Sequence, residues 1–145
     1  MVKAIPDEYH SVQPYLIVQG AAKFIDFVKE AFAAEERMRM DGAGGSVGHA
    51  EVQIGDSVVM LADASNEIPP STSTLLLYVE DCDGIYQRAL TAGATSERAP
   101  QDQFYGDRSA GVNDAFGNRW WLHTHIEDVA PEEMGRRAAA AMAQG

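Results

Sequence analysis

The chain has 145 residues, of which 46% are hydrophobic and 23% charged, proportions typical of an ordinary globular domain. Its formal net charge of −11 argues against nucleic-acid binding, because contact with phosphates needs a basic face. The acidity either serves solubility or favours cationic ligands in an acidic cleft. No apolar run reaches the roughly 18 residues of a membrane span. The first residues lack the apolar core of a signal peptide and Cys82 is the only cysteine, so we expect a cytoplasmic protein.

Hydrophobic periodicity in the first half of the chain predicts one helix among four short strands. The helix is expected because Phe24, Phe27 and Val28 recur at helical spacing. In chain order the expected elements are a strand at residues 13–18, a helix at 20–33, and strands at 35–40, 49–54 and 58–62. A Gly55-Asp56 turn joins the last two strands as a hairpin.

The same order of elements then restarts. The expected elements are a strand at residues 75–79, a helix at 81–93, a strand at 95–98, a strand within 104–113 and a strand at 120–124. A constant offset aligns Val18 with Val79 and Ala31 with Ala92, which indicates an internal duplication. We therefore expect one domain over residues 1–145. Its expected parts are a first module at about 12–64, a linker at 65–73, a second module at about 74–126 and a terminal helix at about 131–143.

Alternation along the strands separates two sheet faces. Ala50, Val52 and Ile54 share one face, which we expect to pack on the helix of the first module. His49, Glu51 and Gln53 share the other face. In the last strand, Trp120 and Leu122 alternate in the same way with Trp121, His123 and His125. The polar faces are expected either to meet solvent or to line a pocket.

Two segments of the second half resemble a known superfamily. They are Phe104-Tyr105-Gly106-Asp107-Arg108 and Val112-Asn113-Asp114-Ala115-Phe116-Gly117-Asn118-Arg119-Trp120. Both resemble the last module of the glyoxalase/bleomycin resistance/dioxygenase (vicinal oxygen chelate) superfamily, and its PhnB-like branch in particular. The resemblance spans about residues 12–135. It implies an α+β fold in which two tandem βαβββ modules form a curved sheet around a shared cavity, and a homodimer.

The resemblance also implies a divalent metal where members of the superfamily are enzymes. Four positions supply its ligands, and Gln13 alone among them offers a suitable side chain here. Thr74, the strand around Met60, and Trp121 replace the other three. We therefore expect no metal and no other cofactor, and neither glyoxalase nor dioxygenase activity, because the Lewis acid for that chemistry would be missing. The less favoured alternative is a metal site at which His49 and His123 serve as ligands.

The favoured hypothesis for function is a protein that binds a small molecule in a metal-free cavity. A planar or cationic ligand would stack on Trp121 or Tyr105, with Glu51 supplying charge. Tyr15 is a further candidate ligand-binding residue. Arg108 either forms an ion pair with Asp107 or binds a ligand carboxylate.

Two other functions stay open. The first is a metal-independent enzyme, a lyase, isomerase or transferase, whose acid–base residues would be His49, Glu51 and His123. His49 and Glu51 lie two residues apart on one strand face, so their side chains point the same way. The alternative for each residue is ordinary packing or hydrogen bonding. The other function is an interaction module whose dimer matters and whose pocket is vestigial.

Overall fold

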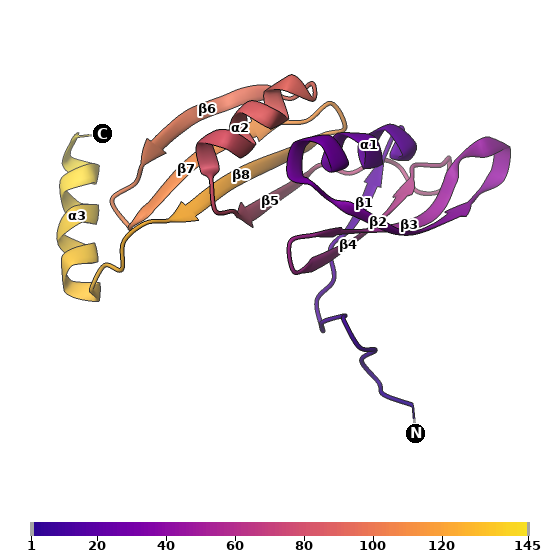
Figure 1. Ribbon diagram of the computed structural model, residues 1–145, viewed down its shortest axis with the longest axis horizontal. Coiled ribbons are helices and arrows are strands. Elements are labelled where there is room, and N and C mark those ends of the chain that lie inside the picture. The colour runs from indigo at the N-terminus through magenta and orange to yellow at the C-terminus, as the bar shows by residue number, and fades with distance from the viewer. Residues whose placement is uncertain (1, 145) are drawn as a thin grey trace. The chain divides into compact units, whose positions relative to one another are not determined.

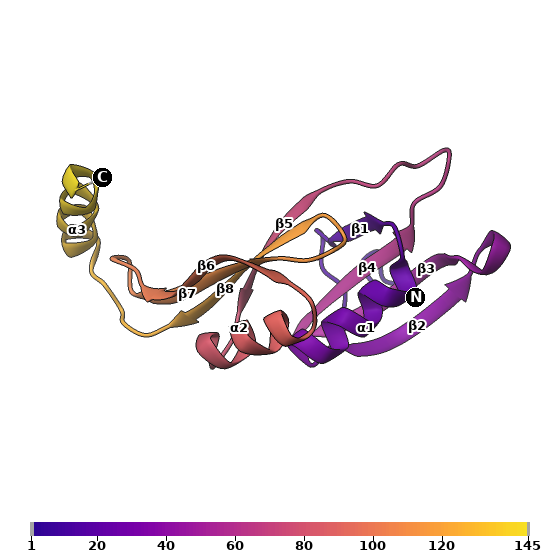
Figure 2. The ribbon, with the colours of Figure 1, turned by 90° about the horizontal axis from the view of Figure 1, so that it is seen from above.

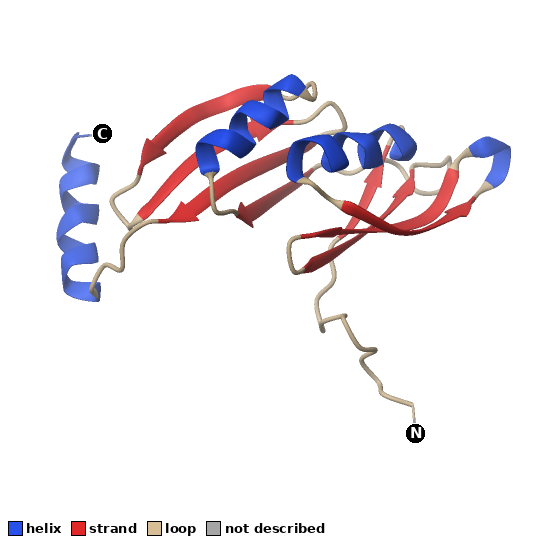
Figure 3. Cartoon of the chain, in the orientation of Figure 1, coloured by secondary structure: helices blue, strands red, loops and turns tan. Residues whose placement is uncertain are grey.

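The computed structural model describes residues 2–144. These residues form two four-stranded sheets, each with a helix on one face, and a helix after the last strand (Figures 1 and 3). The chain divides into two compact units. The first runs up to Ser73 and includes Ala115–Gly117, and the second comprises Thr74–Asp114 and the chain from Asn118 onwards.

The first unit has the order strand, helix, strand, strand, strand. Its elements are β1 (Tyr15–Val18), α1 (Ala21–Phe32), β2 (Glu35–Asp41), the short 3-10 helix η1 (Ala43–Gly45), β3 (Val47–Ile54) and β4 (Ser57–Asp63). The sheet order is β1-β4-β3-β2, in which β1 runs parallel to β4 and the other neighbours are antiparallel. Phe24 and Val28 of α1 are fully buried against this sheet, as their helical spacing predicted, and Ile25 is buried with them.

Asp63, at the end of β4, ties three elements of the first unit together. Its carboxylate accepts hydrogen bonds from the backbone N–H groups of Gly20 and Ala21, where α1 begins, and from that of Val47, where β3 begins. Burial alone would raise the pKa of Asp63, but these three bonds lower it below its usual value. An ionised carboxylate therefore fixes the start of α1 against the sheet.

The second unit repeats the order of the first. Its elements are β5 (Ser73–Tyr78), α2 (Cys82–Thr91), β6 (Thr95–Asp102), β7 (Asp107–Asn113), β8 (Asn118–His125) and the terminal helix α3 (Pro131–Gln144). The sheet order β5-β8-β7-β6 matches that of the first unit. Asp81 caps α2, because its side chain accepts a hydrogen bond from the backbone of Gly84. Figure 2 shows α2 along one face of its sheet.

The core of the second unit lies between α2 and the sheet. Trp120 and Leu122 of β8 and Val112 of β7 are buried there, as the alternation along β8 predicted. Helix α3, in contrast, buries none of its residues. Arg137 connects α3 to Glu127 by an ion pair of 2.7 Å and donates to the carbonyl of Phe104.

The predicted fold class, an α+β arrangement of repeated βαβββ order with a C-terminal helix, is confirmed. The largest difference in element bounds is β6, which was predicted to end at Arg98 and extends to Asp102. In the part of the chain that the structure describes, no helix is long and apolar enough to cross a membrane.

Candidate functional site

The predicted pair His49 and Glu51 lies on the face of the first sheet opposite α1. The Nε2 atom of His49 is 3.4 Å from Oε2 of Glu51. Glu51 is 5% exposed, so its carboxylate is held almost entirely out of water. A buried carboxylate is costly unless hydrogen-bond donors surround it, so its partners define what the site can accept.

Tyr15 joins this pair, as strand register explains. Tyr15 of β1 lies opposite Met60 of β4, and Met60 lies opposite Glu51 of β3, so the three side chains share a face. The hydroxyl of Tyr15 is 2.9 Å from Nδ1 of His49. Both ring nitrogens of His49 are therefore in hydrogen-bond contact with protein groups. This arrangement suits a hydrogen-bond relay better than a free general base.

The N-terminal arm, residues 2–14, brings a further tyrosine to Glu51. The hydroxyl of Tyr9 donates to Oε1 of Glu51 at 2.7 Å, and this bond raises the pKa of Tyr9 above its usual value. The guanidinium of Arg37 stands 5.5 Å from the centre of the Tyr9 ring and pairs with Glu8 at 2.9 Å. The same guanidinium lies 4.0 Å from Glu51. Tyr9 and Arg37 were not among the predicted site residues.

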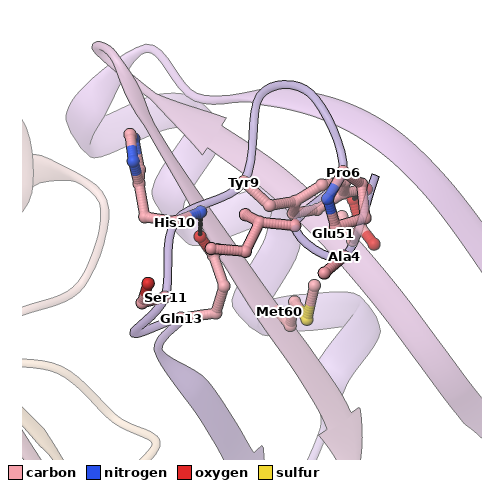
Figure 4. Close-up of a pocket in the computed structure, with 9 residues that line it drawn as sticks. Ala4, Pro6, Tyr9, His10, Ser11, Gln13, Glu51 and Met60 are labelled. Atoms are coloured by element: carbon pink, nitrogen blue, oxygen red, sulfur yellow. Dashed lines mark hydrogen bonds between the residues drawn. The ribbon is translucent and has the colours of Figure 1, made fainter. Parts of the chain in front are cut away.

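A cavity of about 490 Å³ opens between the arm and the sheet (Figure 4). Its volume lies in the range of small-molecule sites. Its lining combines apolar and polar groups, which are Ala4, Ile5, Pro6, Tyr9, His10, Ser11, Gln13, Glu51 and Met60. Among these residues, Glu51 is the one carboxylate, and none is a lysine or an arginine. The cavity therefore has one anionic group in a wall of apolar and aromatic surface.

A second polar cluster lies in the second unit, on the sheet face opposite α2. Asp107 of β7 accepts from two imidazoles, with Oδ2 at 2.9 Å from Nδ1 of His123 and Oδ1 at 2.8 Å from Nδ1 of His125. Tyr105 stacks on the His123 ring at a centroid distance of 6.1 Å, and Tyr78 meets it edge-on at 5.8 Å. The structure thus brings together two predicted residues, Tyr105 and His123, with Asp107 and Tyr78.

Burial would raise the pKa of Asp107, but the hydrogen bonds from His123 and His125 lower it below its usual value. The carboxylates of Asp128 and Asp107, in that order, raise the pKa of His125. The Asp128 contact is an ion pair of 2.7 Å to Nε2 of His125. Asp107 is therefore an ionised, buried acceptor shared by two imidazoles.

Trp121 lies on the same sheet face but is already covered. Its ring lies against Gly111, where an added Cβ would stand 2.5 Å from the indole. The guanidinium of Arg98 stands 5.0 Å from the centre of the ring. A ligand that stacks on Trp121, as the sequence suggested, would have to displace Arg98 from that position.

Arg108 points to the opposite face of the sheet from His123. It forms ion pairs with Asp83 at 2.6 Å and with Asp102 at 3.0 Å, and these bonds raise its pKa further. The predicted ion pair of Arg108 with Asp107 is therefore wrong, because successive strand residues face opposite ways. Arg108 holds β7 against α2 and β6.

The model of the "Glyoxalase/Bleomycin resistance protein/Dioxygenase superfamily" matches residues 9–122 of the chain. This protein belongs to that superfamily. The uncharacterised protein Mb0911c of Mycobacterium bovis is 38% identical over 146 aligned residues, which cover 93% of this chain and 94% of that protein.

Solved structures share the fold. TioX from Micromonospora sp. ML1 has a TM-score of 0.67 at 22% identity, over 80% of this chain and 100% of that one. TnmS3 from Streptomyces sp. CB03234, described as an antibiotic binding protein, has a TM-score of 0.61 at 25% identity, over 80% of this chain and 97% of that one.

The residues at the superfamily's metal-ligand positions do not fit a divalent metal. The side-chain amide of Gln13 is engaged by backbone groups on both sides, since it donates to the carbonyl of Val58 and accepts from the N–H of His10. Met60 presents a thioether where a carboxylate would be needed, and Trp121 presents an indole. Within residues 2–144, no three His, Cys, Asp or Glu side chains are grouped to hold an ion.

Proposed function

We propose that this protein binds a small aromatic molecule carrying a protonated amine, in the cavity between the N-terminal arm and the first sheet. The observation that carries the proposal is the buried carboxylate of Glu51, the one carboxylate among the residues that line a cavity of about 490 Å³. A ligand ammonium that reaches this carboxylate exchanges water for a charge-assisted hydrogen bond in a low-dielectric site.

The walls of the cavity suit the ring of such a ligand. Pro6, Met60 and the Tyr9 ring supply apolar and aromatic surface near Glu51. Methionine and tyrosine both make favourable contacts with an aromatic ring. The net charge of −11 also raises the local concentration of cations and lowers that of anions.

Two further observations support binding over turnover at this site. Both ring nitrogens of His49 contact protein partners, so the ring connects Tyr15 to Glu51 and has no nitrogen left to act as a base. TnmS3, which shares the fold at 25% identity, is described as an antibiotic binding protein. We extend that general role, the binding of a small molecule, to this chain as part of the proposal.

The proposal also includes the PhnB-like branch, a cytoplasmic location and a homodimer. The FYGDR segment at 104–108 supports the branch. Exposed apolar side chains on strands support the dimer, since Met40 and Leu76 are each more than half exposed and a second copy would cover such groups. Light scattering coupled to gel filtration should give twice the monomer mass, and a monomer mass at micromolar concentration would refute the dimer.

The experiment compares three probes by isothermal titration calorimetry. Phenethylamine combines the ring and the ammonium, phenylacetate replaces the ammonium with an anion, and cyclohexylamine keeps the ammonium without the aromatic ring. We expect phenethylamine to bind most tightly and phenylacetate not to bind. Glu51→Gln should raise the Kd for phenethylamine by about tenfold or more, which is the loss expected for one buried charged contact.

The matched control is Glu35→Gln, which removes an exposed carboxylate from the neighbouring strand β2. This variant should leave the Kd unchanged, because its effect on the net charge equals that of Glu51→Gln while the cavity stays intact. Equal affinity for phenethylamine and phenylacetate, or equal losses in the two variants, would reject the proposal.

A further inference from the structure

The second sheet carries an Asp–His pair that the binding site does not use. Asp107 is 5% exposed and His123 is 6% exposed, and they are joined by the 2.9 Å contact between Oδ2 and Nδ1. Asp107 also accepts from His125, so its position is fixed from two sides. The two residues come from adjacent antiparallel strands, β7 and β8, which hold the pair on rigid elements.

This contact sets the tautomer of His123. A carboxylate can only accept at Nδ1, so the proton of the neutral ring lies on Nδ1 and the lone pair lies on Nε2. Among residues 2–144, the one hydrogen bond of the His123 ring is the contact at Nδ1, which leaves Nε2 open to a ligand. His49 differs in this respect, because both of its ring nitrogens have partners.

Two aromatic side chains flank the ring of His123. The plane of Tyr105 is tilted by only 22° from the plane of His123, and the edge-on ring of Tyr78 is two-thirds exposed. Tyr78 and His125, on either side of His123, border a hollow of about 500 Å³ whose other lining residues are Val79, Glu80 and Thr124. The hydroxyls of Tyr78 and Tyr105 bond to none of the described residues, so both are available as donors to an oxyanion.

We propose that His123, positioned by Asp107, is a general base that isomerises a planar conjugated carbonyl compound. In the first step the C–H bond next to the carbonyl breaks, its proton bonds to Nε2 of His123, and its electron pair moves into the enolate. In the second step the proton returns from Nε2 to another carbon of the same molecule. The reaction therefore needs no oxidant, reductant or second substrate. The Asp107 carboxylate stabilises the imidazolium that exists between the two steps.

The test uses 5-nitrobenzisoxazole, a planar probe of general bases. A base removes its ring C–H proton, the C–H electron pair forms a nitrile, and the N–O bond breaks to release a coloured phenolate. We expect the protein to exceed free imidazole at equal concentration by about 100-fold or more, the usual range for a positioned base. A rate equal to that of free imidazole would overturn the proposal.

Three variants separate the roles. His123→Ala should reduce the rate to that of the uncatalysed reaction. Asp107→Asn should reduce kcat by about tenfold or more with little change in KM, because the asparagine no longer enforces the productive tautomer. Asp102→Asn removes a carboxylate that pairs with Arg108 instead, and should leave the rate unchanged. An unchanged rate in His123→Ala would overturn the proposal.

A second readout needs neither a variant nor turnover. Two-bond ¹H–¹⁵N correlation spectra of the unmodified protein distinguish the two neutral tautomers of each histidine. We expect His123 to carry its proton on Nδ1. A proton on Nε2 would contradict the proposal even if the variants failed to fold. Because the residues involved lie in the second unit, these results are independent of phenethylamine binding at Glu51.

Discussion

The hydroxyl of Tyr9 donates a 2.7 Å hydrogen bond to the buried carboxylate of Glu51 across 42 positions of sequence. Through this bond the N-terminal arm closes one side of a cavity whose other side is the first sheet. The arm contributes no strand or helix of its own, so its place on the sheet depends on a few contacts, which include this bond and the bond from Gln13 to the carbonyl of Val58.

Tyr9→Phe should therefore lower Tm while keeping the aromatic wall of the cavity. Glu51→Met removes the acceptor, so adding Tyr9→Phe to it should have almost no further effect on Tm. Tyr86→Phe is the matched control, since Tyr86 donates a hydrogen bond of the same length to Ser96 in the second unit. Its effect should add to that of Glu51→Met. Additive effects of Tyr9→Phe and Glu51→Met would show that the two residues are not coupled.

The contribution of His125 to stability should depend on pH in a defined window. The raised pKa of His125 means that its contribution is complete below the unfolded value of 6.5 and is lost as pH rises through the higher folded value. The lowered pKa of Asp107 means that its contribution is present above the unfolded value of 3.8 and is lost as pH falls below it.

We therefore expect the Tm difference between the wild type and His125→Gln to be greatest at about pH 5–6 and to shrink on either side. Differential scanning calorimetry from pH 3 to pH 9 measures this difference. A difference that stays constant over the whole range would contradict the assignment of charges in this cluster.

Gly111 should be required for the packing of Trp121. An added methyl group would stand 2.5 Å from the indole, so Gly111→Ala should displace the ring and cost about 1–3 kcal/mol of unfolding free energy. Urea denaturation measures the loss, and tryptophan fluorescence reports the displacement. Gly135→Ala is the control, because nothing lies within 4 Å of the added Cβ and alanine favours the helix α3. Equal effects of the two substitutions would contradict the packing described.

Arg108 should matter for stability and not for ligand binding. Its ion pairs with Asp83 and Asp102 are exposed, so Arg108→Ala should lower Tm slightly, and added salt should reduce the difference. The Kd for phenethylamine should not change, because Arg108 lies in the second unit and the cavity lies in the first. A higher Kd in this variant would mean that Arg108 takes part in ligand binding, which was one of the two roles that the sequence left open.

The order of elements could be predicted because each rests on local periodicity. Strand β6 shows where such reasoning stops. Pro100, which cannot donate to a sheet ladder, follows the predicted end of this strand at Arg98. The strand continues to Asp102 because β6 lies at the edge of its sheet, where a missing donor can be tolerated. The edge position is a property of the sheet order, which the local pattern of residues 95–102 does not contain.

The candidate site was predictable only where residues share one strand. His49 and Glu51 could be paired from their spacing, and alternation placed His123 on the polar face. The partner of His123 could not be found in this way, because pairing Asp107 with it requires the register of the β7–β8 hairpin. Counting outward from the turn before Asn118 would have given that register. Tyr9 offers no such signal, since the arm has no periodic pattern.

The position of the bound ligand tests the central claim most directly. The protein would be labelled with ¹³C at its methionine methyl groups and titrated with phenethylamine while methyl spectra are recorded. We predict an upfield ring-current shift for Met60, which lines the cavity, and none for Met142, which is exposed on α3. Saturable binding that leaves the Met60 signal unmoved would contradict the account.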